Sequence, residues 1–411
     1  MGRLLERRAF LQAVLGGAAA SASAPWFAPL AAALEPHPQR RRQCILLWMA
    51  GGPSQMETFD PKPGAATGGP TRAIATRVPG LHIAENLPEI AKRMDRLSIL
   101  RNLTSPEGDH DRGEYYLHTG YPRVQAFPRP TLGSIVSHQS PPADYPLFVS
   151  IGARGLGPAY LGPEHAPFAV ESPTEAVRLI TGLRRERFAL KRLLSFNDAF
   201  DAQHSDAALA RRSAFLARIE RMLNTPFVAA LDLERASPAD RQRYGEGEFA
   251  ERCLLARRLL EAGVQFVEVV HGGWDTHADN FNSVARRCQE IDKPWSVLMD
   301  DLQASGLWDE TVVVWMGEFG RTPQINANNG RDHFPKVTPV VLGGGGLRGG
   351  LAVGQTDATG LEIESGAVRV PDLFATLLTA LGIDPALEFR NEFGAIAPAT
   401  DNGKPIAELL A

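Results

Sequence analysis

The sequence predicts an α/β protein whose core is a mostly parallel sheet flanked by helices. Residues 311–316, TVVVWM, form an unbroken β-branched and apolar run, which is typical of a strand buried on both faces of a parallel sheet. Similar apolar runs at 44–50 and 265–270 lead directly into segments of glycine and polar side chains. With 411 residues, the chain can bury a large core, either as one domain or as two.

Composition and charge exclude several classes of protein. The chain is 44% hydrophobic and 22% charged, which is ordinary for a globular protein. Its net charge of -4 gives no basic surface, so we expect no nucleic-acid partner. The three cysteines form no Cys-x-x-Cys pair, which argues against a thiolate zinc site and against a disulfide framework. Any metal must therefore be held by histidine and carboxylate side chains.

The N-terminus resembles an export signal rather than a part of the fold. Residues 6–12, ERRAFLQ, resemble the twin-arginine motif, and the weakly apolar stretch 13–24 is too short for a stable membrane span. Small residues at 22–24 and 31–33 offer cleavage sites. We therefore expect a signal peptide at 1–33, export to the periplasm or the cell exterior, and no membrane span after cleavage. The alternative is an ordinary amphipathic first helix.

The first strand, expected at 44–50, ends in a glycine pair that is followed by acidic side chains. Two glycines at a strand end allow the backbone to turn tightly. Glu57 and Asp60, in the segment GGPSQMETFDPKP, are thereby delivered to the sheet edge at which the central strand ends. Further elements expected here are a flexible excursion at 64–78, a short helix at 87–94 and a strand at 97–103.

A charged cluster stands at the start of the next expected helix. Asp109, His110 and Asp111 precede a helical pattern that stops at Gly120. The helix dipole and the free N–H groups favour an anion at such a terminus. A histidine between two aspartates can ligate a metal or transfer protons, and it can equally belong to a solvated helix cap.

A strand expected at 265–270 leads into the loop HGGWDTHADN. The spacing of Asp275 and His277 suits metal coordination, because both side chains can converge on one ion. An isolated Asp-x-His pair is a weak signal. The elements expected around this strand are a strand at 146–151, a mostly helical block at 174–261 and a long helix at 281–305.

The central strand at 311–316 is followed by a polar loop. Ligands of open α/β sheets bind at the carboxyl ends of the strands. We therefore predict that this loop, with Glu318, Arg321 and His333, forms a wall of the functional site. The alternative is a surface connection with an Arg321 to Glu318 ion pair. Behind the loop we expect a strand at 337–342, a flexible turn at the literal G-x-G-x-x-G stretch 344–349, and a last core helix at 372–381.

Histidines gather in the loops that follow predicted strands. Of the ten histidines in the chain, four lie in such loops, each within three positions of a carboxylate. We therefore expect these loops to build one site. The four are His110, His271, His277 and His333.

Taken together, these motifs closely resemble the exported proteins known as domain of unknown function 1501. The resemblance covers nearly the whole chain after the signal and implies a branch of the alkaline phosphatase and sulfatase superfamily. It implies a doubly wound sheet in a single domain at 34–411, with a helical insertion at about 174–261. The motifs that carry it are GGPSQMETFDPKP, HDRGEYYLHTG, GGWDTHADN, GEFGRTP and GRDHFP.

The chain departs from the superfamily pattern at two places that concern the chemistry. His110 stands where the superfamily has its catalytic Cys or Ser, and Glu318-Phe319-Gly320 stands where it has Asp-His-Gly. The usual covalent mechanism is therefore not carried over to this chain.

The resemblance implies a divalent metal, namely zinc, calcium, magnesium or manganese, and a phosphate or sulfate ester as substrate. The substrate would be a small anionic ester or a sulfated glycan. His110, Asp111 and Arg321 are the expected catalytic residues, with His110 as acid, base or further ligand and Arg321 holding the anionic group. The alternative is a non-catalytic envelope module that keeps the fold and binds an anion or glycan. The candidate metal ligands are Glu57, Asp60, Asp275, His277, Glu318 and His333.

Overall fold

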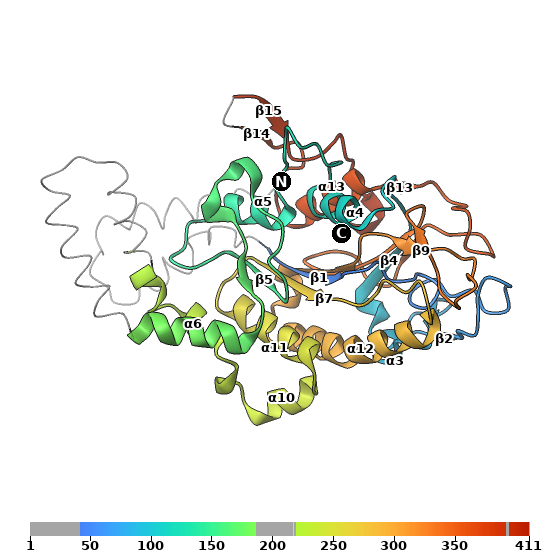
Figure 1. Ribbon diagram of the computed structural model, residues 1–411, viewed down its shortest axis with the longest axis horizontal. Helices are drawn as coiled ribbons and strands as arrows, with labels where there is room; N and C mark the ends of the chain where they lie inside the picture. The colour runs from blue at the N-terminus through green and yellow to red at the C-terminus, as the bar shows by residue number, and fades with distance from the viewer. Residues whose placement is uncertain (1–41, 186–216, 218, 392–393, 411) are drawn as a thin grey trace, which may run out of the picture. The chain divides into compact units, whose positions relative to one another are not determined.

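The computed structural model describes residues 42–185, 217, 219–391 and 394–410. Within these ranges, a nine-stranded sheet forms the centre (Figure 1). In spatial order its strands are β12 (Ala352–Val353), β4 (Leu97–Thr104), β11 (Thr338–Gly344), β8 (Thr311–Met316), β1 (Gln43–Met49), β7 (Phe266–His271), β5 (Phe148–Ile151) and β6 (Phe168–Val170), with β13 (Val368–Arg369) beside β4. All of them run in one direction except β11, which is antiparallel to both of its neighbours.

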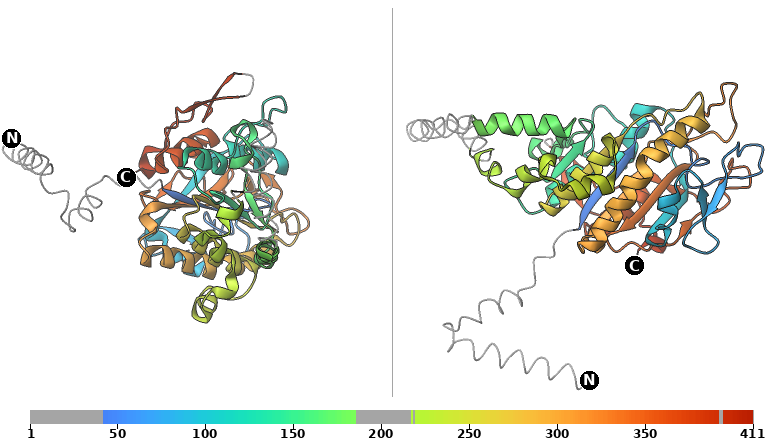
Figure 2. Two further views of the ribbon diagram at one scale, coloured as in Figure 1. Left: turned by 90° about the vertical axis from the view of Figure 1, so that its left-hand side faces the viewer. Right: turned by 90° about the horizontal axis from the view of Figure 1, so that it is seen from below.

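Helices cover both faces of this sheet (Figures 1 and 2). Along β1, Ile45 and Leu47 belong to one core cluster and Leu46 and Trp48 to the other, because successive side chains of a strand point to opposite faces. The first face is covered by α3 (Pro88–Ala91), α6 (Pro173–Arg185), α9 (Pro226–Leu231), α10 (Pro238–Tyr244), α11 (Glu248–Glu261) and α12 (Asn280–Ala304). The second face is covered by α4 (His110–Thr119), α5 (Leu132–Gln139) and α13 (Val370–Ala380).

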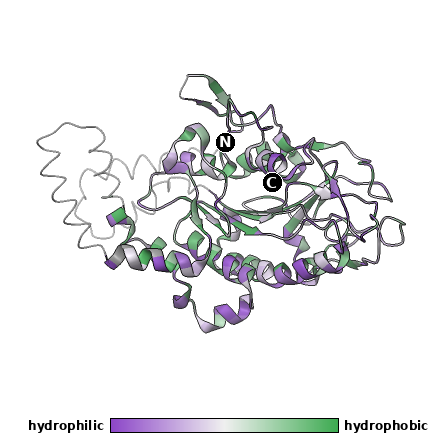
Figure 3. Cartoon of the chain, viewed as in Figure 1, coloured by the Kyte–Doolittle hydropathy of each residue, from purple (hydrophilic) through white to green (hydrophobic). Residues whose placement is uncertain are grey.

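The predicted α/β class, with a doubly wound and mostly parallel sheet, is confirmed. The outer helices combine hydrophilic and hydrophobic residues (Figure 3), as expected for helices that pack on a sheet with one side only. The expected strand at 311–316 has the bounds of β8, and the long helix expected at 281–305 begins and ends one residue earlier, as α12. The turn expected at 344–349 lies at Gly345 and Gly346, directly after β11, and both glycines have positive φ angles.

Two expectations about local structure are wrong in part. The excursion expected at 64–78 contains β2 (Ala73–Ala75), which pairs with β3 (His82–Ala84). The helix expected at 87–94 is shorter, because α3 ends at Ala91. Two further strand pairs are β9 (Gly320–Arg321) with β10 (His333–Phe334), and β14 (Glu388–Arg390) with β15 (Ile396–Pro398). Short 3-10 helices occur at Met94–Arg96, Ala159–Leu161, Pro163–His165, Leu233–Arg235, Trp308–Glu310 and Ala407–Leu409.

Two predicted segments lie wholly or partly outside the described residues. The signal peptide at 1–33 is one of them, and residues 186–216 and 218 of the expected helical block are the other. The remainder of that block does contain helices, namely α6 and α9 to α11. Of the helices in the described part of the chain, none is long and apolar enough to cross a membrane.

Candidate metal centre

The carboxyl ends of β8, β1 and β7 lie side by side, since β1 pairs in parallel with both of the others. The loops behind these strands therefore meet at one edge of the sheet, where open α/β sheets bind ligands. The loop after β7 carries Asp275 and His277, and the loop after β8 carries His333. Helix α4 adds His110, its first residue.

Glycines allow these loops to pack closely on one another. A β-carbon added to Gly51, whose φ is +114°, would lie 2.4 Å from the backbone nitrogen of Asp275. A β-carbon at Gly330 would lie 1.8 Å from the carbonyl oxygen of His277. No side chain tolerates such contacts, so only glycine fits at either position. The loop with Asp275 and His277 is thereby held between the turn after β1 and the loop after β8.

His277 and His333 face each other through their Nε2 atoms, which lie 3.0 Å apart. Nδ1 of His277 lies 2.7 Å from Oδ1 of Asp332, and Nδ1 of His333 lies 2.8 Å from the carbonyl oxygen of Gly108. Both of these oxygens only accept hydrogen bonds, so each Nδ1 donates a proton to its oxygen, and a neutral ring then presents an electron pair at Nε2. Two such electron pairs at this separation repel each other unless a proton on one ring or a metal ion lies between them.

Asp275 adds a third electron-pair donor to the two imidazoles. Its Oδ1 lies 3.1 Å from Nε2 of His277 and 3.3 Å from Nε2 of His333. Burial opposes the charge of this carboxylate, but the hydrogen bond and the charge of Arg321 outweigh burial and lower the pKa of Asp275. Asp275 is therefore held as a carboxylate, and the Oδ1 atom that faces the two imidazoles also accepts a hydrogen bond of 2.6 Å from Arg321.

His110 approaches the same triangle from the start of α4. Its Nε2 atom is buried, lies 3.5 Å from Oδ2 of Asp275, and has no hydrogen-bond partner among the described residues. One possible ligand atom from each of His110, Asp275 and His333 lies within 4.8 Å of the other two. His110 therefore stands where it can either ligate a cation or exchange a proton.

Glu318 orients His110. Its Oε1 atom lies 2.6 Å from Nδ1 of His110 and also accepts a hydrogen bond of 2.9 Å from the backbone N–H of Gly51. This contact raises the pKa of His110, chiefly through the hydrogen bond. Glu318 is only 3% exposed, so it is not part of a surface ion pair with Arg321.

The donor triangle of Asp275, His277 and His333, with His110 beside it, fits a metal ion. Zinc is bound by imidazole nitrogen and carboxylate oxygen in tetrahedral sites, and donor atoms at such bond lengths lie about 3.3 Å apart. The three distances within the triangle are 3.0, 3.1 and 3.3 Å. Each imidazole is also held at Nδ1 by an oxygen, as is usual for metal-ligating histidines.

The structure corrects the expected role of Arg321. Its guanidinium is fully buried and points into the protein. Nε donates to the carbonyl oxygen of Gly52 at 2.9 Å, and Nη1 donates to that of Arg331 at 3.2 Å. Nη2 donates to the carbonyl oxygen of Gly51 and, at 2.6 Å, to Oδ1 of Asp275. Arg321 therefore positions Asp275 and the turn after β1 and does not clamp the anionic group of a substrate.

Glu57 lies outside the cluster, in contrast to its expected role as a ligand. It forms a fully buried ion pair with Arg331, with distances of 2.8 Å from Nη2 to Oε1 and 3.0 Å from Nε to Oε2. Nδ2 of Asn280 donates to Oε2 at 2.8 Å, and Thr276 in turn donates to Asn280 at 2.6 Å. Both carboxylate oxygens are thus used. Glu57 joins the loop of Thr276 to the loop of Arg331, and these loops carry the donor triangle.

Three further side chains that were expected at the functional site have other surroundings in the structure. Asp60 is buried, accepts a hydrogen bond from Thr356, and forms ion pairs with Lys62 at 3.1 Å and Arg101 at 3.5 Å. His271 is buried as well, and its Nε2 lies 2.9 Å from Oε2 of Glu290. Burial lowers the pKa of His271 to about 4, so this imidazole is neutral. Asp111 is exposed in the first turn of α4.

Two residues that hold the site were not singled out from the sequence. Asn280 and Arg331 are fully buried around Glu57. Arg331 does belong to the segment GRDHFP, but nothing in that segment indicates a buried arginine. The sequence offered no signal for them, because the burial of Glu57, which makes a partner of opposite charge necessary, is visible only in the structure.

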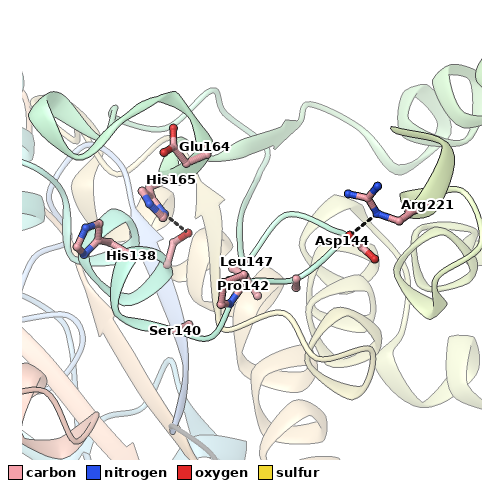
Figure 4. Close-up of a pocket in the computed structure, with 10 residues that line it drawn as sticks. His138, Ser140, Pro142, Asp144, Leu147, Glu164, His165 and Arg221 are labelled. Atoms are coloured by element: carbon pink, nitrogen blue, oxygen red, sulfur yellow. Dashed lines mark hydrogen bonds and ion pairs between the residues drawn. The ribbon is translucent and has the colours of Figure 1, made fainter. Parts of the chain in front are cut away.

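Two cavities lie apart from the donor triangle, and none of its residues lines either of them. One has a volume of about 780 Å³ and lies beside Tyr244 and Pro294. The other has a volume of about 590 Å³ (Figure 4). Polar side chains at this second cavity contact each other, for example Arg221 with Asp144 at 2.8 Å. The candidate metal centre is therefore an open cluster at the sheet edge and lines neither of these two cavities.

Fold and site together define an α/β protein with a mostly parallel sheet and a histidine and aspartate cluster at its carboxyl edge. A comparison with curated proteins gives no match. The model of the family of proteins of unknown function DUF1501 matches residues 41–410, so the chain belongs to this family.

Several solved structures are similar to this chain. One is a phosphonate monoester hydrolase of Agrobacterium radiobacter, with 11% identity, a TM-score of 0.40, and coverage of 90% of this chain and 77% of that chain. Another is the PsFucS1 sulfatase from Pseudoalteromonas sp., with 13% identity, a TM-score of 0.37, and coverage of 89% and 74%. A third is a protein in the alkaline phosphatase superfamily from Vibrio parahaemolyticus, with 11% identity, a TM-score of 0.37, and coverage of 90% and 71%. At this identity the likeness concerns the fold alone.

Proposed function

We propose that this chain is an exported metal-dependent hydrolase that acts on a phosphate or sulfate ester. The observation that carries the proposal is the triangle of electron-pair donors formed by Asp275, His277 and His333, with distances of 3.0 to 3.3 Å. A divalent ion held there supplies Lewis-acid polarisation of an ester oxygen. His110, oriented by Glu318, either adds a further ligand or moves a proton at Nε2.

The donor set supports zinc over calcium or magnesium. Imidazole nitrogens outnumber carboxylate oxygens in the cluster, and calcium and magnesium bind oxygen ligands almost exclusively. Manganese accepts such a mixed set less readily than zinc does.

The exposure of the ligands bears on the substrate. The side chains of Asp275 and His277 are both 46% exposed, so the centre opens directly to solvent. An ester on a large molecule such as a sulfated glycan can reach such a centre as well as a small anionic ester can.

A second candidate function is a non-catalytic envelope module that keeps the fold and binds an anion or glycan. One observation favours it: Arg321, an expected catalytic residue, is fully buried and donates to acceptors of the protein instead of facing a reacting ester. In this alternative the site binds its ligand without turnover.

Metal analysis of the purified protein, combined with assays on aryl phosphate and aryl sulfate esters, tests the proposal. We expect about one zinc ion per chain and ester hydrolysis that chelation abolishes and zinc restores. His277→Ala should lose both the metal and the activity. Bound zinc without hydrolysis of any ester would contradict the hydrolase, and a folded protein that binds no divalent ion would favour the binding module.

We also propose export by the twin-arginine pathway, on the basis of Arg7 and Arg8 in the segment ERRAFLQ. Replacing both arginines with lysine should leave the precursor in the cytoplasm, as fractionation of expressing cells would show. Unchanged export of that variant would contradict the proposal.

A further inference from the structure

A charged cluster lies in the core of the sheet. Glu268, in the middle of β7, is 2% exposed, and His118 of α4 is 5% exposed. Oε1 of Glu268 lies 2.7 Å from Nε2 of His118, and Ser150 on β5 donates to Oε2 at 2.8 Å. The neighbouring positions of β7 are valines, so this carboxylate is an exception within a core strand.

The contacts of His118 favour its protonated, positively charged form. Its Nδ1 lies 2.8 Å from the carbonyl oxygen of Glu114, so both ring nitrogens face oxygens that accept hydrogen bonds. Burial alone would lower the pKa of His118, but the hydrogen bond and the charge of Glu268 outweigh burial and raise it. The ring of Trp48, 4.2 Å away between centroids, also favours a cation.

The pair joins two elements that both lead to the metal centre. Helix α4 begins at His110, and the loop behind β7 carries Asp275. His110 and His118 are separated by two steps of four residues, which places them on one face of the helix. With a rise of 1.5 Å per residue, about 12 Å of helix lies between them. A shift of α4 along β7 would move His110 by the same amount relative to Asp275.

Hydrogen bonds between charged groups fix a geometry that apolar contacts leave open. A buried ion pair is weak evidence for stability, because two apolar side chains of similar volume often stabilise a core as well or better. Each hydrogen bond of the pair does, however, require one distance and one direction.

We propose that His118 and Glu268 are positioning residues of the metal centre. They fix the register of α4 against β7 and thereby place Nε2 of His110 beside Asp275. This inference rests on the metal centre proposed above, with His110 as a ligand of its ion.

The main test replaces both members of the pair at once. The double variant Glu268→Met with His118→Leu, the apolar pair, removes both charges, so no buried ion is left unpaired and the variant can fold. We expect zinc affinity, measured by competition with a chromogenic chelator, to fall about 10- to 100-fold, the usual effect of losing a group that orients a metal ligand. The urea midpoint should change little. Zinc affinity equal to that of the wild type would overturn the proposal.

The conservative variant Glu268→Gln should keep most of the zinc affinity. Its amide can accept from Ser150 and donate to a neutral His118, which preserves the register. A loss as large as that of the apolar pair would show that charge, rather than position, is what the centre needs.

Two comparisons of zinc affinity separate a positioning role from a general loss of stability. In a His110→Ala background, the apolar pair should have little further effect on zinc affinity, because it acts through His110. A matched control is Asp301→Ala, which breaks a buried contact of 2.9 Å between α12 and Arg257 of α11, on the opposite face of the sheet from α4. The control should lower stability and leave zinc affinity unchanged. An equal loss of affinity in the control, or an undiminished loss in the His110→Ala background, would overturn the proposal.

A measurement on the metal-free protein tests the positioning role separately from the proposed hydrolase function. Nitrogen-15 shifts of the imidazoles in metal-free protein report which ring nitrogen of His110 carries the proton. The apolar pair should change the His110 signal and leave that of exposed His82 on β3 unchanged. If the wild type bound no zinc, the metal centre would fail, and the His110 signal would still decide whether the pair positions α4.

Discussion

Replacing His277 or His333 with alanine is expected to reduce zinc affinity by more than about 100-fold, because losing a group that merely orients a ligand already costs about 10- to 100-fold. Each change removes one corner of the donor triangle, in which the two Nε2 atoms lie 3.0 Å apart. The double variant should lose much less than the product of the single losses, since the first change already breaks the shared site. Competition titration of the three variants measures this coupling.

The matched control is His82→Ala, which removes an exposed imidazole from β3. It should bind zinc as the wild type does. Single losses that multiply in the double variant would mean that His277 and His333 act at separate places, and the shared centre would have to be abandoned.

Glu57→Ala is expected to lower the free energy of unfolding by about 3–5 kcal/mol, because it leaves the buried cation of Arg331 without its partner. Both side chains are fully buried, and the bidentate contact has distances of 2.8 and 3.0 Å. Zinc affinity should fall as well, since Glu57 joins the loops that carry Asp275 and His333. Urea unfolding of the metal-free protein gives the first quantity, and zinc titration gives the second.

A surface ion pair serves as the control for Glu57. Glu362 is 66% exposed and contacts Lys336, so Glu362→Ala should change stability by at most about 1 kcal/mol and leave zinc binding intact. If Glu57→Ala cost no more than this control, Arg331 would be satisfied by other groups, and the ion pair would not hold the loops.

The core strands were predictable because burial on both faces constrains every residue of a strand. β8 is β-branched or apolar at all of its positions and has the bounds that the sequence indicates. The direction of β11 was not predictable in the same way. Its apolar run looks alike in a parallel and an antiparallel strand, and the direction depends on where the preceding loop returns the chain.

The site was predictable as a gathering of loops. Asp275, His277 and His333 follow strands whose carboxyl ends share an edge, so their proximity follows from the parallel sheet. The roles of single side chains did not follow. Glu57 resembles any other acid after a strand, yet in the structure its oxygens belong to Arg331 and Asn280.

By itself, the sequence determined the α/β class, the order of the core strands along the chain and the loops that contain the histidines and acids, because local periodicity and strand ends carry that information. Only the tertiary structure decided which of these side chains turn outward to a metal and which turn inward to hold the loops. The physical reason is that the direction of a loop side chain depends on partners far away in the sequence. Arg321 donates to the carbonyl oxygen of Gly51, 270 positions away, and this contact turns an expected substrate clamp into a support for Asp275.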